Sequence, residues 1–358
     1  MTPRAAYEAV IAAPREAGTE GAARAVALLS AHLRERGWSI REQRFRFQPA
    51  SLNAFPLLGA GLGWLTLLEL PLLLGRFPAP LAPLVWFGGA AALGLLAWGI
   101  GTGVEVPGAE RREDVNLIAT RGAEPVRRWL VAHVDTKAQG HSMAGRLVAV
   151  WVMLVAALVL SGLALWRPLQ ADPLPGWAVG AGAGLSLAGG ALAARGRLRG
   201  TTVGARDNGT GLLALLAAAD ALAGPGTGLI LTGAEEFGLV GARVLARTLD
   251  AEGVEVVNLD TLTDQGRLYV VAHDRRGAEL ASRLAPALHG IAPELRVRRL
   301  PAGILTDSVP FARAGFAAVT IGRLSWADLG RLHTPRDTPE ALSLHTAEAV
   351  GRALGGLR

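Results

Sequence analysis

Residues 128–135 read RWLVAHVD, an apolar run that ends in a histidine and an aspartate. A short apolar run of this kind predicts a buried strand. Residues 228–233 and 254–260 are similar runs, and each is followed or ended by acidic residues. Between these runs the apolar residues recur at helical spacing. Strands that alternate with helices predict an α/β fold with a mostly parallel central sheet flanked by helices.

The rest of the chain outside two long apolar blocks follows the same alternation. Further strands are predicted at residues 38–47, 115–120, 268–272, 295–300 and 317–321. Helices are predicted at residues 22–36, 277–289 and 339–356, and two more are predicted to start at Thr210 and Leu239. These elements belong to one predicted soluble domain of residues 1–50, 105–146 and 195–358.

The two apolar blocks interrupt this domain, at residues 51–104 and 147–194. Each block splits at a proline-rich break, which predicts helices near 54–75, 81–103, 147–166 and 177–194. Each helix approaches the ~20 residues needed to cross a bilayer. We therefore expect two inserted transmembrane helical hairpins. The alternative is that they are buried core helices, but four such segments are hard to bury in one small core.

Individual residues in and beside the apolar blocks predict further features of the membrane segments. Glu69 is either a functional carboxylate within the membrane or a residue at its interface. Gly176, Gly180 and Gly184 have a four-residue spacing that favours close helix packing. Arginines gather beside the soluble segments and are sparse at the hairpin tips. Positive charge prefers the cytoplasmic side, so we expect a multi-pass protein of the inner cell membrane with a cytoplasmic catalytic domain.

Composition narrows the chemistry. The chain has no cysteine, which excludes disulfides and thiolate metal ligands. The formal net charge is +6, but the arginines are scattered or flank apolar blocks, which argues against nucleic acid as a partner. Because cysteine is absent, any metal must be held by histidine, aspartate or glutamate.

Such residues follow the predicted strands, where ligands of α/β proteins gather. They are His133, Asp135, Asp207, Glu235, Glu236, Asp260, Asp307 and His333. Each one alone is more often a cap, a turn or a surface residue. Together they form a mixed nitrogen and oxygen donor set that suits Zn²⁺. In the Glu235–Glu236 pair, one carboxylate can bind metal while the other accepts a proton from water.

Six segments in one order carry a resemblance to the M28 family of zinc aminopeptidases. They are AHVDT, ARDNGTG, TGAEEFGLVGA, VNLDTLTDQG, TDSVPF and HTPRDTPEA, starting at residues 132, 205, 232, 257, 306 and 333. The resemblance implies a zinc aminopeptidase-like fold and two zinc ions. It implies as metal ligands His133, Asp207, Glu236, Asp260 and His333, with Asp207 bridging the ions.

The resemblance also implies roles for neighbouring residues. Glu235 would be the general base, and Asp135 would orient His133. Asp337 would do the same for His333, and Asp307 and Ser308 would line the substrate pocket. The expected function is a membrane-embedded metallo-aminopeptidase that removes N-terminal residues from peptides with a water activated by two zinc ions. Its expected partners are peptide substrates and the lipid bilayer.

Three other functions stay open. A non-catalytic, peptidase-like binding protein would keep the fold, although such relatives usually lose ligands. A serine hydrolase could use Ser142 in GHSMAG (residues 140–145), with Asp307 and His333 as partners, but this leaves the other carboxylates unexplained. A glutaminyl-cyclase-like activity would need a single zinc, whereas the presence of both His133 and Asp260 favours two.

Overall fold

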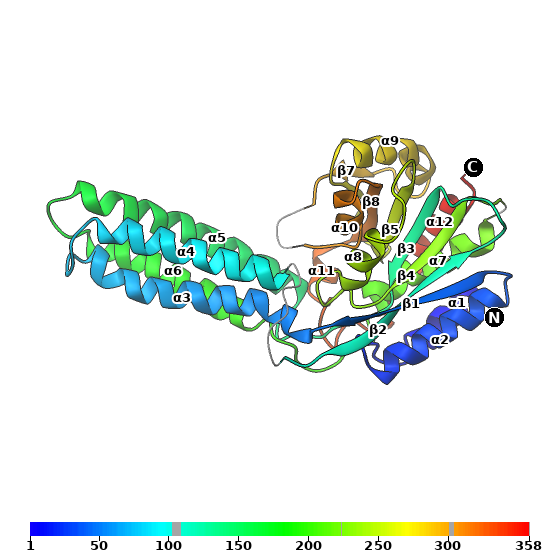
Figure 1. Ribbon diagram of the computed structural model, residues 1–358, viewed down its shortest axis with the longest axis horizontal. Coiled ribbons are helices and arrows are strands. Elements are labelled where there is room, and N and C mark those ends of the chain that lie inside the picture. Colours follow the sequence, from blue (N-terminus) through cyan, green and yellow to red (C-terminus); the bar gives the residue numbers. More distant parts are fainter. Residues whose placement is uncertain (102–108, 223, 301–303, 358) are drawn as a thin grey trace. The chain divides into compact units, whose positions relative to one another are not determined.

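The computed structural model describes residues 1–101, 109–222, 224–300 and 304–357 (Figure 1). The chain folds as two compact units. The first, which we call the sheet unit, comprises Met1–Pro49, Glu110–Ala138 and Gly200–Arg358. The second, the helical unit, comprises Ala50–Ala109 and Gln139–Arg199. Each unit is described by itself.

The sheet unit is built on a mixed sheet of eight strands in the order β1-β2-β4-β3-β5-β8-β6-β7. The strands are β1 (Ser39–Phe47), β2 (Arg112–Thr120), β3 (Arg128–His133), β4 (Thr227–Thr232), β5 (Glu255–Leu262), β6 (Arg267–Ala272), β7 (Arg296–Arg298) and β8 (Ala317–Leu324). The central strands β4, β3, β5 and β8 pair in parallel. Antiparallel pairing joins β1 to β2, β2 to β4 and β6 to β8. The predicted α/β class is therefore confirmed, with the parallel pairing concentrated at the centre.

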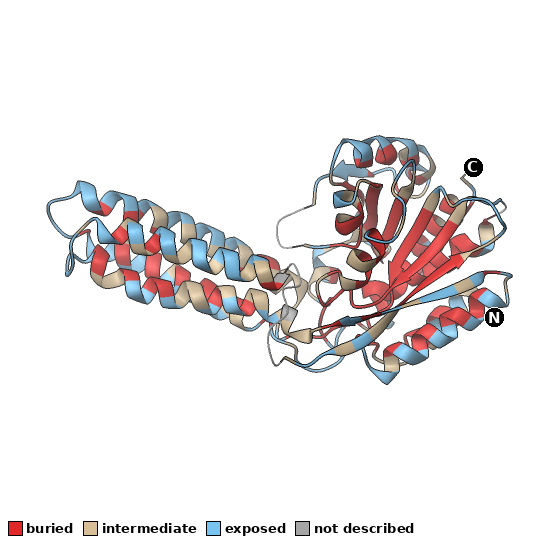
Figure 2. Ribbon diagram, viewed as in Figure 1, coloured by how far each residue is buried: buried red, intermediate tan, exposed pale blue. Residues whose placement is uncertain are grey.

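Helices cover both faces of this sheet. They are α1 (Pro3–Val10), α2 (Glu20–Arg34), α7 (Gly211–Ala221), α8 (Val240–Ala246), α9 (Arg275–His289), α10 (Ser308–Arg313), α11 (Trp326–Leu329) and α12 (His345–Gly355). Successive residues of β3 show why both faces need cover. Leu130 and Ala132 pack in the core beneath α7, whereas Trp129 and Val131 pack with α8 and α10. A strand that is apolar on both faces is stable only between two layers (Figure 2).

A buried arginine connects the residue after β3 to the segment that leads to Asp207. The guanidinium of Arg15, which is fully buried, donates hydrogen bonds to the carbonyls of Val134, Val203 and Gly204. Val134 directly follows β3, and Gly204 directly precedes the π-helical segment η3 (Ala205–Thr210). Because buried carbonyls need donors, Arg15 fixes both segments in place.

The helical unit contains the four helices α3 (Ala54–Leu73), α4 (Leu81–Gly101), α5 (Met143–Trp166) and α6 (Gly176–Ala194). A short 3-10 turn, η2 (Arg167–Leu169), follows α5, and another, η1 (Pro49–Asn53), precedes α3. Helix α5 starts four residues before the predicted position 147, because the Ser142 side chain caps it by accepting a hydrogen bond from the Gly145 amide. These four helices are long and apolar enough to cross a membrane, by length and composition.

The outer surface of the helical unit is apolar, whereas its interior holds the polar contacts. Trp64, Trp98 and Leu158 are about 70% exposed. Inside, Thr66 and Ser186 are hydrogen-bonded, and Trp86 donates to Ser161. This arrangement is the reverse of a helix bundle in water, which places its polar face outward.

Close helix packing in this unit uses other glycines than those the sequence pattern indicated. A Cβ atom at Gly176, Gly180 or Gly184 would meet nothing within 4 Å, so the packing role expected for this spacing is wrong. A Cβ at Gly59 of α3 would instead lie 2.8 Å from the Gly190 carbonyl of α6. Because both residues lack side chains, these two helices approach backbone to backbone.

Glu69 lies on α3 and is fully buried within the helical unit. Neither of its carboxylate oxygens has a hydrogen-bond partner among the described residues.

Candidate metal centre

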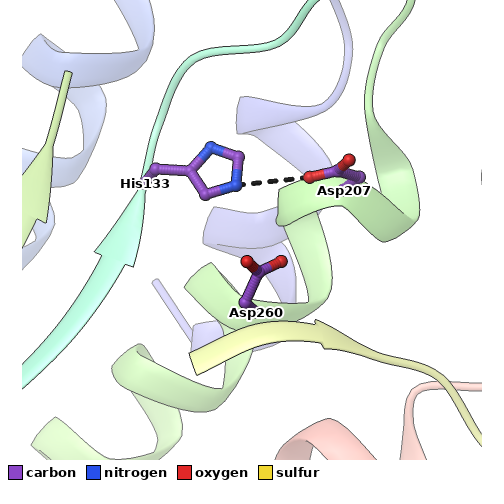
Figure 3. A group of neighbouring side chains, drawn as sticks. All are labelled: His133, Asp207 and Asp260. Carbon is purple, nitrogen blue, oxygen red and sulfur yellow. Dashed lines mark ion pairs between the residues drawn. The ribbon is translucent and has the colours of Figure 1, made fainter. Parts of the chain in front are cut away.

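Asp207 stands between two histidines. Its Oδ1 atom lies 3.2 Å from Nε2 of His133, and its Oδ2 atom lies 3.2 Å from Nε2 of His333. His133 is the last residue of β3, and Asp207 belongs to η3 (Figure 3). One carboxylate that presents an oxygen to each of two histidines has the geometry needed to bridge two cations.

Two groups of potential ligands share this aspartate. The first group is His133, Asp207 and Asp260, and the second is Asp207, Glu236 and His333. Within each group the ligand atoms lie within 4.8 Å of one another. In Figure 3 the carboxylates of Asp207 and Asp260 both face the ring of His133. The structure thus brings together all five residues that the resemblance implied as ligands.

The backbone that carries Asp207 is held by side chains from distant elements. The Asp337 carboxylate accepts hydrogen bonds from the amides of Arg206 and Asp207, at 2.9 and 3.0 Å. Asn208 donates to the carbonyl of Leu259 and accepts from the amide of Thr261, which flank Asp260. The second contact fixes Asp207 relative to the end of β5.

The expected role of Asp337 is therefore wrong. Its carboxylate holds the Asp207 backbone and pairs with the Arg206 guanidinium, and it does not bind His333. Nδ1 of His333 is buried and has no hydrogen-bond partner among the described residues. His333 also has a φ of 61°, in the left-handed region that few residues other than glycine adopt.

Asp135 holds the loop that presents the two glutamates. Its carboxylate oxygens accept hydrogen bonds from the amides of Glu235 and Glu236, at 3.0 and 3.1 Å. Its backbone carbonyl lies 3.0 Å from Nδ1 of His133, whereas its carboxylate is 3.8 Å from that atom. Asp135 thus contacts His133 as expected, but through its backbone, and its carboxylate positions the glutamate pair.

The environment of Glu235 favours proton acceptance. Burial raises the pKa of Glu235 well above its usual value, and the negative charges of Glu236, Asp307 and Asp260 raise it further. Burial likewise raises the pKa of Asp260 to about 7. A carboxylate with a raised pKa is a stronger base near neutral pH, which is what a general base needs.

Lys137 belongs to the centre and was missed among the sequence-predicted site residues. Its Nζ atom lies 2.6 Å from Oε2 of Glu236, and both side chains are buried. Although burial opposes the charged form, Lys137 and His333 lower the pKa of Glu236 to about 2. One signal was available: Lys137 is the single lysine among 36 basic residues.

The side chains of Asp307 and Ser308 both form hydrogen bonds with other residues of the protein. Asp307 accepts a hydrogen bond from Thr232 at 2.5 Å, and burial raises its pKa to about 6. The Ser308 hydroxyl lies 2.7 Å from Nε2 of His273 and 2.6 Å from Oγ1 of Thr320. The hydroxyl of Ser308 is therefore held within the protein, and the pocket role of both residues stays a prediction.

The serine-hydrolase alternative lacks its structural requirement. Ser142 caps α5 in the helical unit, and its hydroxyl accepts a hydrogen bond from the Gly145 amide. A nucleophilic serine of that class sits on a sharp turn between a strand and a helix. The segment before Ser142 contains only an isolated bridge, between Gln139 and Leu198, in the described structure.

The donor set fits divalent cations, and zinc in particular. Four carboxylates converge here: those of Asp207, Glu235 and Glu236 are buried, and that of Asp260 is half-buried. Oε1 of Glu236 and Nδ1 of His333 are buried without hydrogen-bond partners among the described residues. Buried negative charge is stable only when cations compensate it. Imidazole and carboxylate ligands without thiolate suit Zn²⁺.

Known proteins share the fold of this chain. This chain is similar to the aminopeptidase from Aneurinibacillus sp. strain AM-1, at 15% identity and a TM-score of 0.56, over 99% of this chain and 92% of that one. A zinc aminopeptidase from Bacillus subtilis has 15% identity and a TM-score of 0.56, over 99% and 94%. A glutaminyl cyclase from Fimbriiglobus ruber has 16% identity and a TM-score of 0.55, over 99% and 93%.

At these identities the three structures show a shared fold and no more. No curated protein sequence matches this chain. The family model described as peptidase family M28 matches residues 190–357, which include Asp207, Glu235, Glu236, Asp260 and His333. The resemblance drawn from the sequence motifs is therefore confirmed by the match of residues 190–357 to the model of peptidase family M28.

Proposed function

We propose that this chain is a membrane-embedded aminopeptidase that uses two zinc ions to remove N-terminal residues from peptides. The observation that carries the proposal is the position of Asp207, whose two oxygens lie 3.2 Å from Nε2 of His133 and of His333. The match to peptidase family M28 and the shared fold with zinc aminopeptidases support it.

The ligands would divide into two sets with Asp207 in common. His133 and Asp260 would hold one zinc ion, and Glu236 and His333 would hold the other. When bound, the ions would activate water and polarise the peptide carbonyl. The remaining steps belong to the side chains.

Glu235 would accept the proton of the attacking water and return it to the leaving amine. Its raised pKa suits both transfers, because the group must be basic first and acidic afterwards. Asp135 would keep Glu235 in place through the backbone amide that it binds.

A second candidate is glutaminyl cyclisation with a single zinc ion. Glutaminyl cyclases occur among the structures that share this fold. The ammonium of Lys137 also lies beside Glu236 and could take the place of a second metal ion in that ligand set. We favour the peptidase because both ligand sets are complete, including the one with His133 and Asp260.

Membrane embedding forms part of the proposal. The four helices of the helical unit have the length and hydropathy of bilayer spans, and their outward side chains are apolar. Both hairpins are inserted between segments of the sheet unit, and the second separates His133 from Asp207 in sequence. We propose that the substrates are membrane-associated or short apolar peptides, cleaved on the cytoplasmic side of the inner membrane.

The proposed activity predicts release of free amino acids from a library of peptides with varied N-terminal residues. A zinc chelator should abolish the release, and added zinc should restore it. Peptides with N-terminal glutamine should lose that residue, not cyclise with release of ammonia. Ammonia and pyroglutamyl product without free amino acids would replace the proposal by the cyclase alternative, and chelator-resistant activity would refute both.

Replacement of Glu235 by glutamine should reduce turnover by about 10³-fold or more, because the amide cannot accept a proton. Zinc content, measured by elemental analysis, should stay that of the wild type, since Glu235 is assigned no metal. Glu252→Gln, a matched change at an exposed position, should keep full activity. Near-normal turnover of Glu235→Gln would exclude it as the base.

Zinc affinity should fall as the pH decreases. In the metal-free protein the pKa of His133 is raised by Glu235, Asp207 and Asp260 although burial opposes this. The pKa of Asp260 is raised to about 7. Both must be deprotonated to bind zinc, so protons compete below these pKa values. Asp260 alone should weaken binding about tenfold between pH 8 and pH 6.

Competition with a chelating dye at both pH values measures this change, corrected for the dye's own titration. Equal zinc affinity at pH 6 and pH 8 would mean that neither group is a ligand.

The proposed topology is tested with a protease on sealed vesicles. The sheet unit should be digested in inside-out vesicles and protected in right-side-out vesicles, because the arginines beside it favour the cytoplasmic side. Detergent should expose it in both. Protection in inside-out vesicles would reverse the topology, and recovery of the intact chain in the aqueous fraction would remove the membrane assignment.

A further inference from the structure

Lys137 is the only lysine of a chain with 36 basic residues. It follows β3 by four residues and is 5% exposed. Its Nζ atom lies 2.6 Å from Oε2 of Glu236 and 3.3 Å from the backbone carbonyl of the same residue. A buried ammonium with two contacts to one glutamate is part of the centre and not a surface charge.

The ammonium acts on one ligand set only. Oε2 of Glu236, which Lys137 contacts, also lies 3.4 Å from Nε2 of His333. This is the set of Asp207, Glu236 and His333. Neither carboxylate of the first set, on Asp207 or Asp260, forms an ion pair with a lysine or arginine in the described part of the chain. The two sets therefore differ by one positive charge beside a ligand.

The charge has a direct effect on metal binding. A divalent cation at the second set must share Oε2 of Glu236 with an ammonium or displace it. Like charges a few ångströms apart in a buried site repel strongly. The ammonium also satisfies one of the two carboxylates of the second set before any metal arrives. The second set should therefore bind more weakly than the first.

Lysine suits this task better than arginine. An ammonium is compact and ends a flexible stem, so it can occupy the place of a small cation and withdraw from it. A guanidinium is planar, larger and always charged. The chain uses arginine at all its other basic positions, so the lysine here follows the demands of the site and not the general composition.

We infer that Lys137 makes the two metal positions unequal: the set with Asp260 fills first, and the second ion binds only when the ammonium leaves Oε2 of Glu236. The inference rests on the proposed zinc-binding function. It assigns the chain a centre with one firmly held ion and one exchangeable ion. The exchangeable position is controlled by a side chain of the protein.

A single lysine makes the inference directly observable. Full-length protein is labelled with ¹³Cε-lysine, solubilised in detergent micelles and stripped of metal, and it then gives one lysine side-chain signal. Zinc is added stepwise while elemental analysis counts the bound ions. The first equivalent should leave the signal unmoved, and the second should shift it. A shift completed by the first equivalent, or no shift with two ions bound, overturns the inference.

Two variants separate charge from packing. Lys137→Met keeps the stem length and removes the charge, so affinity for the second ion should rise about tenfold or more. Affinity for the first ion should change less than about threefold, which also reports that the centre is folded. Lys137→Arg keeps the charge and should leave the second ion weakly bound. Unchanged affinity for the second ion in Lys137→Met overturns the inference.

The same titration tests the role of Lys137 separately from the proposed zinc-binding function. Two ions that bind the wild type with equal affinity refute the role of Lys137 and leave the proposed enzyme intact. Wild-type protein that binds no zinc refutes the proposed function itself, and the inference fails with it.

Discussion

The centre depends on one buried carboxylate shared between two histidines. Asp207 can present an oxygen to His133 and to His333 only if β3, η3 and the loop before α12 meet at one place. Its neighbours include three further carboxylates, on the buried Glu235 and Glu236 and on the half-buried Asp260. Such a concentration of negative charge in a protein interior is unfavourable without cations, and this constraint shapes the surroundings.

Many polar side chains around the centre form hydrogen bonds with the backbone of the segments that carry the ligands. Asp337 binds the amides that carry Asp207, and Asp135 binds the amides that carry the two glutamates. Arg15 and Asn208 do the same for carbonyls on either side. Each of these groups would be costly to bury alone, so each contact satisfies two groups at once. The result is a rigid frame in which the ligand side chains keep their positions.

The helical unit follows a different rule. Its outer surface is apolar and its few polar side chains pair inside, which is the arrangement that a lipid solvent favours. The glycine spacing in α6 indicated a packing face, yet Gly176, Gly180 and Gly184 meet open space. Spacing along one helix identifies a face but does not identify the helix that packs on it. The contact of Gly59 with Gly190 depends on the partner helix.

The sequence by itself determined the alternation of strands and helices, the four apolar helices and eight candidate residues at strand ends, and its resemblance to the M28 family implied the five that converge. Apolar periodicity and the tendency of ligands to gather at strand ends are local properties, so they can be predicted from one chain. Only the tertiary structure decided what Asp337 and the carboxylate of Asp135 bind, and that Lys137 reaches Glu236. Those contacts join residues that are up to 131 positions apart, and their partners depend on how the chain packs.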